Sequence, residues 1–173
     1  EFFALSPDYS TVFRRFLSLD LRDRVAIRGQ MIGPISFGLK VTDEARKPII
    51  YNSDVKAILF EFLAGKINRQ LAELQAVHPN AFVWLDDPGL EFIFSSLSGY
   101  TDIVARDDMA GFLDSLQGLK GLHLCGNPDW DFLLTASLDL LSFDAYARGE
   151  VFARYAGQIK RFLDKGGILS WGI

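Results

Sequence analysis

Five short apolar runs alternate with stretches of helical periodicity along this 173-residue chain, and this alternation restricts its fold more than any other feature. The five runs cover residues 25–33, 81–89, 119–126, 138–145 and 166–173. Nearly uniform apolar runs of this length are typical of strands in a parallel sheet that is covered on both faces. The sequence therefore predicts an α/β protein built from βα units, with one domain over residues 1–173.

The segments between the runs show apolar side chains at helical spacing. A long helix is predicted from Ser53, as its cap, to about Val77, after a loop or small hairpin over residues 40–53. Further helices are expected over residues 7–18, 107–116 and 150–164, with a short one opening near Pro128. We expect His78, which follows the long helix, to be a solvated residue at its C-terminal end.

The amino-acid composition limits the classes of function that this chain can have. A chain with 49% hydrophobic residues and 15 Phe can bury a sizeable core, so we expect one soluble globular domain. The net charge of -4, without a basic run, predicts neither nucleic acid nor an anionic membrane as a partner. A single cysteine excludes an internal disulfide, and no stretch resembles a signal peptide or a membrane span, so a cytoplasmic location is expected.

Polar residues gather where the predicted strands end. His123 and Cys125 lie two residues apart, so their side chains are expected on one face of a strand. An imidazole nitrogen and a thiolate there can bind one zinc ion at about 2.0 to 2.3 Å, and Gly126 then lets the chain turn without crowding the metal. The alternative is a buried cysteine that behaves as a small hydrophobe beside a hydrogen-bonded histidine.

Three aspartates belong to the same group of strand ends. Asp86 is expected at the mouth of the cavity, where it can bind a ligand's ammonium group by a charge-assisted hydrogen bond. Asp87 is either a second substrate-binding carboxylate or a helix or turn cap. Three roles are open to Asp144: a zinc ligand, a residue that orients His123, or a cap of the following segment.

Five segments carry a resemblance to a known family: "MIGPISFGL" (31–39), "WLDDP" (84–88), "GLHLCGNPDW" (121–130), "LDLLSFDAY" (138–146) and "GGILSWGI" (166–173). Their order and spacing resemble the catalytic barrel of cobalamin-independent methionine synthase. They are closer still to the short stand-alone methionine-synthase-like proteins, in the superfamily of uroporphyrinogen decarboxylase and the zinc-dependent corrinoid methyltransferases. The resemblance covers nearly the whole chain.

The resemblance implies a TIM (β/α)8 barrel that acts in methionine biosynthesis as a zinc-dependent methyltransferase. By this comparison His123, Cys125 and Asp144 match metal ligands, with zinc binding the sulfur of homocysteine or a similar thiol. Asp86 matches the residue that holds the substrate's amino group, and it is our candidate catalytic residue. The methyl donor is expected to be a corrinoid, presented by a corrinoid protein, rather than methyl-folate, because no tryptophan follows Ser36 in the "GPIS" segment.

The chain departs from the family pattern at several points. Asp144 stands where the classical enzymes have a glutamate, Asp87 replaces the glutamate of D-E-P, and no second cysteine is present to complete the ligand set. Because a barrel of this type needs eight strands, the five predicted βα units imply an incomplete barrel, its central part, whose open edges favour self-association and whose activity alone is low. The alternatives are a decarboxylase related to uroporphyrinogen decarboxylase, which would need more arginines, and a non-catalytic relative that binds a metal or small ligand.

Overall fold

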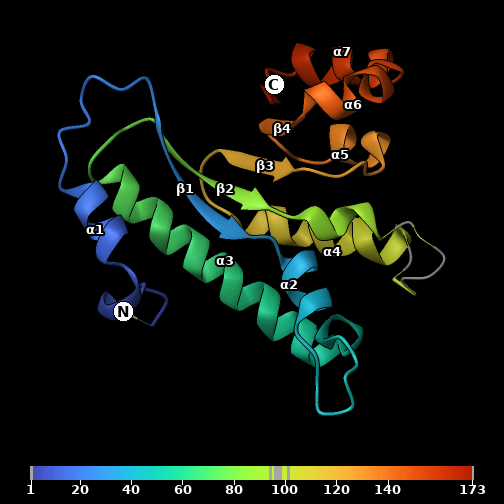
Figure 1. The fold of residues 1–173 in the computed structure, drawn as a ribbon, viewed down its shortest axis with the longest axis horizontal. Helices are drawn as coiled ribbons and strands as arrows, with labels where there is room; N and C mark the ends of the chain where they lie inside the picture. The colour runs from blue at the N-terminus through green and yellow to red at the C-terminus, as the bar shows by residue number, and fades with distance from the viewer. Residues whose placement is uncertain (1, 94, 96–98, 101, 173) are drawn as a thin grey trace.

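The protein is an α/β structure built on one parallel sheet (Figure 1). The computed structural model describes residues 2–93, 95, 99–100 and 102–172. Its five strands follow one another across the sheet in chain order, and every neighbouring pair is parallel. They are β1 (Ile27–Ile32), β2 (Ala81–Asp86), β3 (Lys120–Leu124), β4 (Leu140–Asp144) and β5 (Ile168–Gly172). Each lies within a run that the sequence predicts, so the parallel α/β prediction is confirmed.

One face of the sheet carries the core. Alternate residues of the strands are almost fully buried there, because helices pack over that face: Val83, Leu85, Leu122, Leu124, Leu141 and Phe143. The long helix α3 (Ser53–Gln75) lies across β1 and β2, with Leu63, Ile67 and Leu71 buried beneath it (Figure 1). Gly29 of β1 allows this helix to approach, since a Cβ at that position would lie 2.5 Å from the Gln70 side chain.

The opposite face is open, so the prediction of a sheet covered on both faces is wrong. A cavity on that face is lined by strand residues alone: Arg28, Gln30, Trp84, Asp86, His123, Ser142 and Ser170. The physical reason is the strand order. When consecutive parallel strands are neighbours, right-handed crossovers place every connecting helix on the same side of the sheet. Alternation of buried and exposed residues along β1 follows from this one-sided cover.

Several helix boundaries differ from the prediction because capping and turn residues outweigh periodicity. The predicted helix over 7–18 is divided into a 3₁₀ turn, η1 (Pro7–Tyr9), and α1 (Thr11–Leu17). Asn52, not Ser53, caps α3, since its side chain accepts hydrogen bonds from the backbone amides of Asp54 and Val55. The predicted helix over 150–164 is two helices, α6 (Ala145–Ala153) and α7 (Ala156–Asp164).

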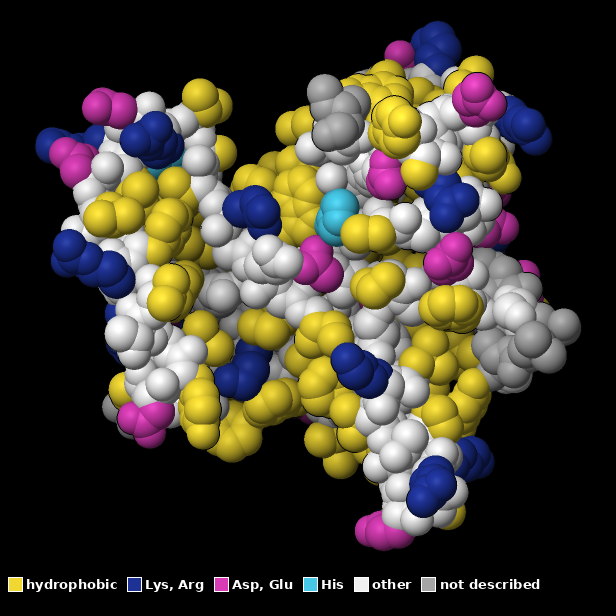
Figure 2. Space-filling view, in the orientation of Figure 1, with side chains coloured by type: hydrophobic (Ala, Val, Ile, Leu, Met, Phe, Trp, Pro, Cys, Tyr) yellow, Lys and Arg dark blue, Asp and Glu magenta, His cyan; other side chains and the backbone are white. Residues whose placement is uncertain are grey.

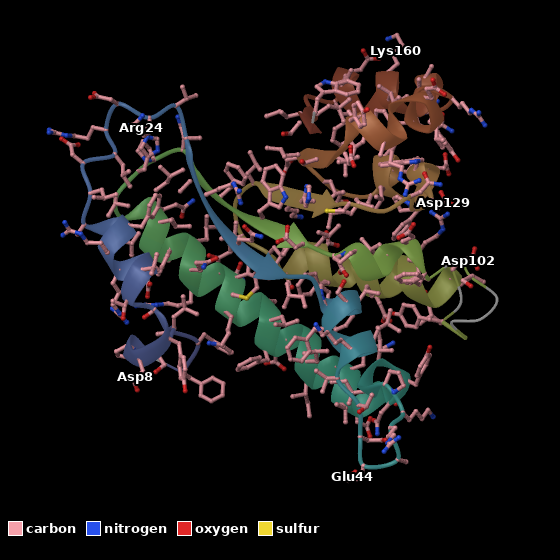
Figure 3. All side chains as sticks on the ribbon, viewed as in Figure 1. Asp8, Arg24, Glu44, Asp102, Asp129 and Lys160 are labelled. Atoms are coloured by element: carbon pink, nitrogen blue, oxygen red, sulfur yellow. The ribbon has the colours of Figure 1, made fainter. Side chains whose placement is uncertain are left out.

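Shorter helices and turns make up the rest of the connections between the strands. The short helix α2 (Pro34–Lys40) was not predicted, although Pro34 at its first turn is a typical start signal. Residues 40–53 contain an isolated antiparallel bridge from Thr42 to Pro48 and a 3₁₀ turn, η2 (Ile49–Tyr51). The others are η3 (Pro88–Glu91), α4 (Asp102–Ser115) and α5 (Trp130–Thr135). Asp129, labelled in Figure 3, caps α5 by accepting from the amide of Phe132 at 2.8 Å.

His78 is buried, with 4% of its surface exposed, so its predicted solvent exposure is wrong. Its Nε2 lies 2.9 Å from the carbonyl oxygen of Arg24, and its Nδ1 accepts from the amide of Asn80 at 3.1 Å. The side chain therefore joins the end of α3 to the segment before β1. In the part of the chain that the structure describes, no helix has the length and apolar character needed to cross a membrane.

Candidate functional site

The candidate site is the cavity on the open face of the sheet, with a volume of about 380 Å³. All five strands contribute to its lining, and the lining combines both signs of charge with one large aromatic ring, Trp84. In Figure 2 a histidine side chain lies beside an acidic one near the centre of the view, with a basic side chain and hydrophobic surface to one side. Such a mixture of convergent polar groups and apolar wall is typical of a small-molecule site.

His123 and Cys125 lie together at the carboxyl end of β3. Cys125 follows the strand directly and is exposed, and its Sγ lies 3.3 Å from Nε2 of His123. The other imidazole nitrogen, Nδ1, lies 3.0 Å from Oγ of Ser142 on the neighbouring strand β4. When Nδ1 donates its proton to that oxygen, the lone pair of Nε2 is directed to the side where Cys125 lies.

This geometry can be tested against the expected zinc ion. Two ligands of a tetrahedral zinc, one nitrogen and one sulfur, lie about 3.5 Å apart, and the Nε2 to Sγ distance is close to this value. The Ser142 contact is also of the kind that orients metal-binding histidines. Within the described residues, however, no group of three or more His, Cys, Asp or Glu side chains is arranged to hold a metal. His123 and Cys125 can therefore supply two of the four ligands of one zinc ion.

The loop that carries Cys125 is held in place by Glu91 of η3. Its Oε1 accepts from the amide of Asn127 at 3.0 Å, and a Cβ on Gly126 would lie 2.3 Å from its Oε2. Gly126 is therefore needed for the approach of Glu91, a contact that the sequence did not indicate. Asn127 in turn accepts from Nε1 of Trp130, a fully buried residue, at 3.0 Å. These contacts connect the site to the core.

Asp86 lies at the same level of the sheet as His123, its partner in the β2–β3 register. Nε2 of Gln30 donates to Oδ2 of Asp86, and Oε1 of Gln30 accepts from Nη1 of Arg28 at 3.1 Å. The Arg28 guanidinium lies over the Trp84 ring, 5.3 Å from its centroid. The carboxylate of Asp86 thus faces the cavity, as the sequence predicts, and a neutral amide positions it.

Asp87 faces away from this cavity and is fully buried. Its carboxylate accepts from the amides of Ile35 and Ser36 at 3.2 and 2.7 Å, and from Oγ of Ser36 at 2.6 Å. Burial raises the pKa of Asp87 to about 6, against the opposing effect of the hydrogen bonds from Ser36 and Ile35. The structure thus places Asp87 at the N-terminus of α2, in the capping role that the sequence left open.

Asp144 caps α6, which is one of the three roles that the sequence left open. Its Oδ1 accepts from the amide of Ala147 at 2.9 Å. The residue that contacts His123 from β4 is Ser142 instead, two positions earlier on the same strand face. Asp144 is not brought into a three-ligand group with His123 and Cys125 among the described residues.

Sequence reasoning missed three residues of the site: Ser142, Gln30 and Arg28. Ser142 could have been found, because it shares a strand face with Asp144 and interrupts an otherwise apolar strand. Gln30 and Arg28 alternate with buried residues along β1 in the same way. Their contacts with Asp86 and Trp84 span more than fifty residues of sequence, so no local pattern could have paired them.

The chain was compared with known protein families, curated proteins and solved structures. Neither family models, nor curated proteins, nor solved structures give a match to the chain.

Proposed function

We propose that this chain forms part of a zinc-dependent methyltransferase of the methionine synthase type, which passes a methyl group to homocysteine or a similar small thiol. The observation that carries the proposal is the His123 and Cys125 pair, with its zinc-compatible spacing and with Ser142 behind the imidazole. Histidine nitrogen and cysteine sulfur are the donors that zinc prefers in proteins.

The placement of the five segments that resemble the family supports the same proposal. The segments 31–39 and 84–88 are joined by the bonds between Ser36 and Asp87. The backbone amide of Asp87 donates to the carbonyl oxygen of His123 at 3.1 Å, which joins 84–88 to 121–130. The contact of His123 with Ser142 continues to 138–146, and β4 pairs with β5 in 166–173. Segments far apart in the sequence therefore meet at one end of the sheet.

We propose in addition that the sheet is an arc of a (β/α)8 barrel, and the fold supports this. Barrels of this type have parallel strands in chain order, helices outside and the site at the carboxyl ends of the strands. The described sheet has that order and that one-sided helix cover (Figure 1). In this proposal the cavity face is the barrel interior, while β1 and β5 are the edges at which further strands or a second chain would pair.

In this proposal His123 and Cys125 would hold the zinc, and Ser142 would keep the imidazole in the orientation that binding requires. Bound zinc lowers the pKa of a thiol, which is ordinarily about 8.5, and so favours the nucleophilic thiolate. Asp86 binds the substrate's ammonium group through its cavity-facing carboxylate, and Gln30 holds that carboxylate in position. We propose a corrinoid, carried by a partner protein, as the methyl donor, since Phe37 follows "GPIS" where folate-dependent relatives have tryptophan.

The experiment is a measurement of bound zinc, by mass spectrometry and calorimetric titration, on the purified chain and two variants. We expect one zinc per chain, lost in Cys125→Ser and retained in Asp86→Ala. Binding of homocysteine is expected to weaken in Asp86→Ala. A chain that binds no zinc at any concentration tested, or that binds it equally well after Cys125→Ser, would contradict the proposal. Equal loss of zinc in Asp86→Ala would contradict the role given to Asp86.

A further inference from the structure

A second cavity lies on the helix-covered side of the molecule, between α3 and α4, with a volume of about 510 Å³. We call it the α3–α4 groove. Phe60 of α3 and Phe112 of α4 line it with their rings edge to face, the centroids 5.6 Å apart. Gly111 keeps it open, since a Cβ at that position would meet no atom of another segment within 4 Å. The groove therefore has an aromatic wall and room for side chains from another molecule.

The charged side chains that line this groove are all carboxylates. Asp108 is compensated, because its Oδ2 lies 2.5 Å from Nζ of Lys56 and accepts from the hydroxyl of Tyr100. Glu61 and Asp107 are exposed, and no ion pair joins either to another residue within the described parts of the chain. Two uncompensated carboxylates beside aromatic rings favour a partner that combines a cation with apolar side chains.

The same chain presents a surface of this kind on η1 and α1. Tyr9, Val12 and Arg15 follow one another at intervals of three residues, so they lie on one side of these helical turns. Tyr9 is 93% exposed and Val12 is 83% exposed. Arg15 is exposed and, like Glu61, belongs to no ion pair in the described residues, whereas Arg14 donates to its own helix. We call this surface the α1 stripe, and exposed apolar residues beside a charge typically mark an interaction site.

The α1 stripe and the α3–α4 groove lie on neighbouring parts of the surface. Phe3 lines the groove and packs on Gly65 of α3, where a Cβ would lie 2.6 Å from its ring. Tyr9 of the stripe follows only six residues later, and the N-terminal segment and α1 lie beside α3 (Figure 1). Figure 2 shows hydrophobic side chains gathered over this part of the molecule. Two complementary surfaces so close together can both be used around one two-fold axis.

We infer that two copies of this chain associate through these surfaces, with the α1 stripe of each copy packed in the α3–α4 groove of the other. Tyr9 and Val12 lose their exposure against the aromatic wall, and Arg15 pairs with the uncompensated carboxylates. A second copy is the partner because one chain has both halves of the complementary pair. The contact uses helices rather than the sheet edges β1 and β5, and it does not depend on the proposed methyltransferase.

Sedimentation velocity on the purified chain, over a range of protein concentrations, tests the association. We expect an equilibrium between monomer and dimer. It should persist with chelator present, because no metal takes part, and shift toward monomer at high salt, because salt screens exposed ion pairs. A chain that stays monomeric at the highest concentration measured would overturn the inference.

Gly111→Gln fills the groove. Its side chain enters open space and favours the helix more than glycine does, so we expect the fold to be kept and dimerisation to weaken about tenfold or more. Gly149→Gln is the matched control, because Gly149 lies in α6, outside the groove, and has the same open space at its Cβ. Equal dimerisation in the two variants would assign any dimer to another surface, such as the sheet edges, and overturn the inference.

Exchange of charges tests the pairing of Arg15. Arg15→Glu is expected to weaken dimerisation about tenfold, because the pair occurs twice in a symmetric dimer and attraction becomes repulsion. Glu61→Arg added to that variant restores opposite charges, so most of the affinity should return. Arg154→Glu, at the exposed end of α6, changes the net charge equally and should have no effect. A double variant that dimerises no better than Arg15→Glu alone would contradict the inferred contact.

Discussion

Nδ1 of His123 lies 3.0 Å from Oγ of Ser142, so a side chain on β4 determines the orientation of the imidazole on β3. The two residues are also partners in the strand register, and Ser142 is 7% exposed. The contact therefore fixes which imidazole nitrogen faces Cys125.

The first prediction concerns this contact. Ser142→Ala removes the hydroxyl and leaves Nδ1 without its partner, so zinc affinity is expected to fall about tenfold or more while Cys125 is untouched. Competition titration with a chromophoric chelator measures the change. Ser170→Ala is the matched control, since Ser170 lines the same cavity in register with Ser142. An equal loss in both variants would mean that the cavity as a whole, not the hydroxyl, sets the affinity.

Asp144 is predicted to act as a helix cap and not as a zinc ligand. Asp144→Ala removes the acceptor for the Ala147 amide and is expected to lower the free energy of unfolding by about 1 kcal/mol. Asp144→Asn keeps an acceptor and should retain most of that stability. Chemical denaturation measures both variants. Zinc affinity is expected to be unchanged in each, and a loss of zinc common to the two would instead identify Asp144 as a ligand.

Asp87 is predicted to make stability depend on pH. Burial raises the pKa of this carboxyl from 3.8 to about 6, so the folded state holds its proton more tightly than the unfolded state does. Protonation of Asp87 therefore stabilises the folded state. This stabilisation is complete below about pH 4 and is lost as pH rises through about 6, a change of about 3 kcal/mol in the free energy of unfolding.

Asp87→Asn tests the effect because an amide does not titrate. Urea denaturation of both proteins between pH 4 and 7.5 should show a difference in unfolding free energy that changes with pH across this window. The variant also loses one of the acceptors for Ile35 and Ser36, which lowers its stability by about 1 to 3 kcal/mol at low pH. A difference that stays constant with pH would contradict the assignment to Asp87.

Replacement of Gln70 is predicted to raise the stability of the protein. Its side chain is 7% exposed, and its Oε1 is buried without a hydrogen-bond partner among the described residues. Gln70→Met keeps the length of the side chain and removes the unsatisfied oxygen, so thermal and urea denaturation should show a gain of about 1 kcal/mol. Gln75→Met, at the end of the same helix where the side chain is exposed, is the control and should be near neutral. A loss of stability in Gln70→Met would show that the amide is satisfied.

The sequence by itself determined the order and type of the main elements. The five strands lie inside the five runs, because short, largely apolar runs between turn signals favour buried strands when the segments between them have helical periodicity. It also determined that His123 and Cys125 lie together, since two residues of spacing at a strand end place their side chains on one side. Both results depend on local geometry alone.

Only the tertiary structure decided what the polar residues contact. The predictions of cover on both faces of the sheet, of a solvated His78 and of a cap at Ser53 were wrong. Asp87 and Ser142 received their roles from segments that are far from them in the sequence. A side chain's burial and partners depend on which elements pack beside it. Here β1, α2 and β4 contact Asp86, Asp87 and His123 through residues 19 to 56 positions apart in the sequence. Local patterns contain no information on such pairs, because the free energy that selects them comes from packing of the whole sheet and its helices.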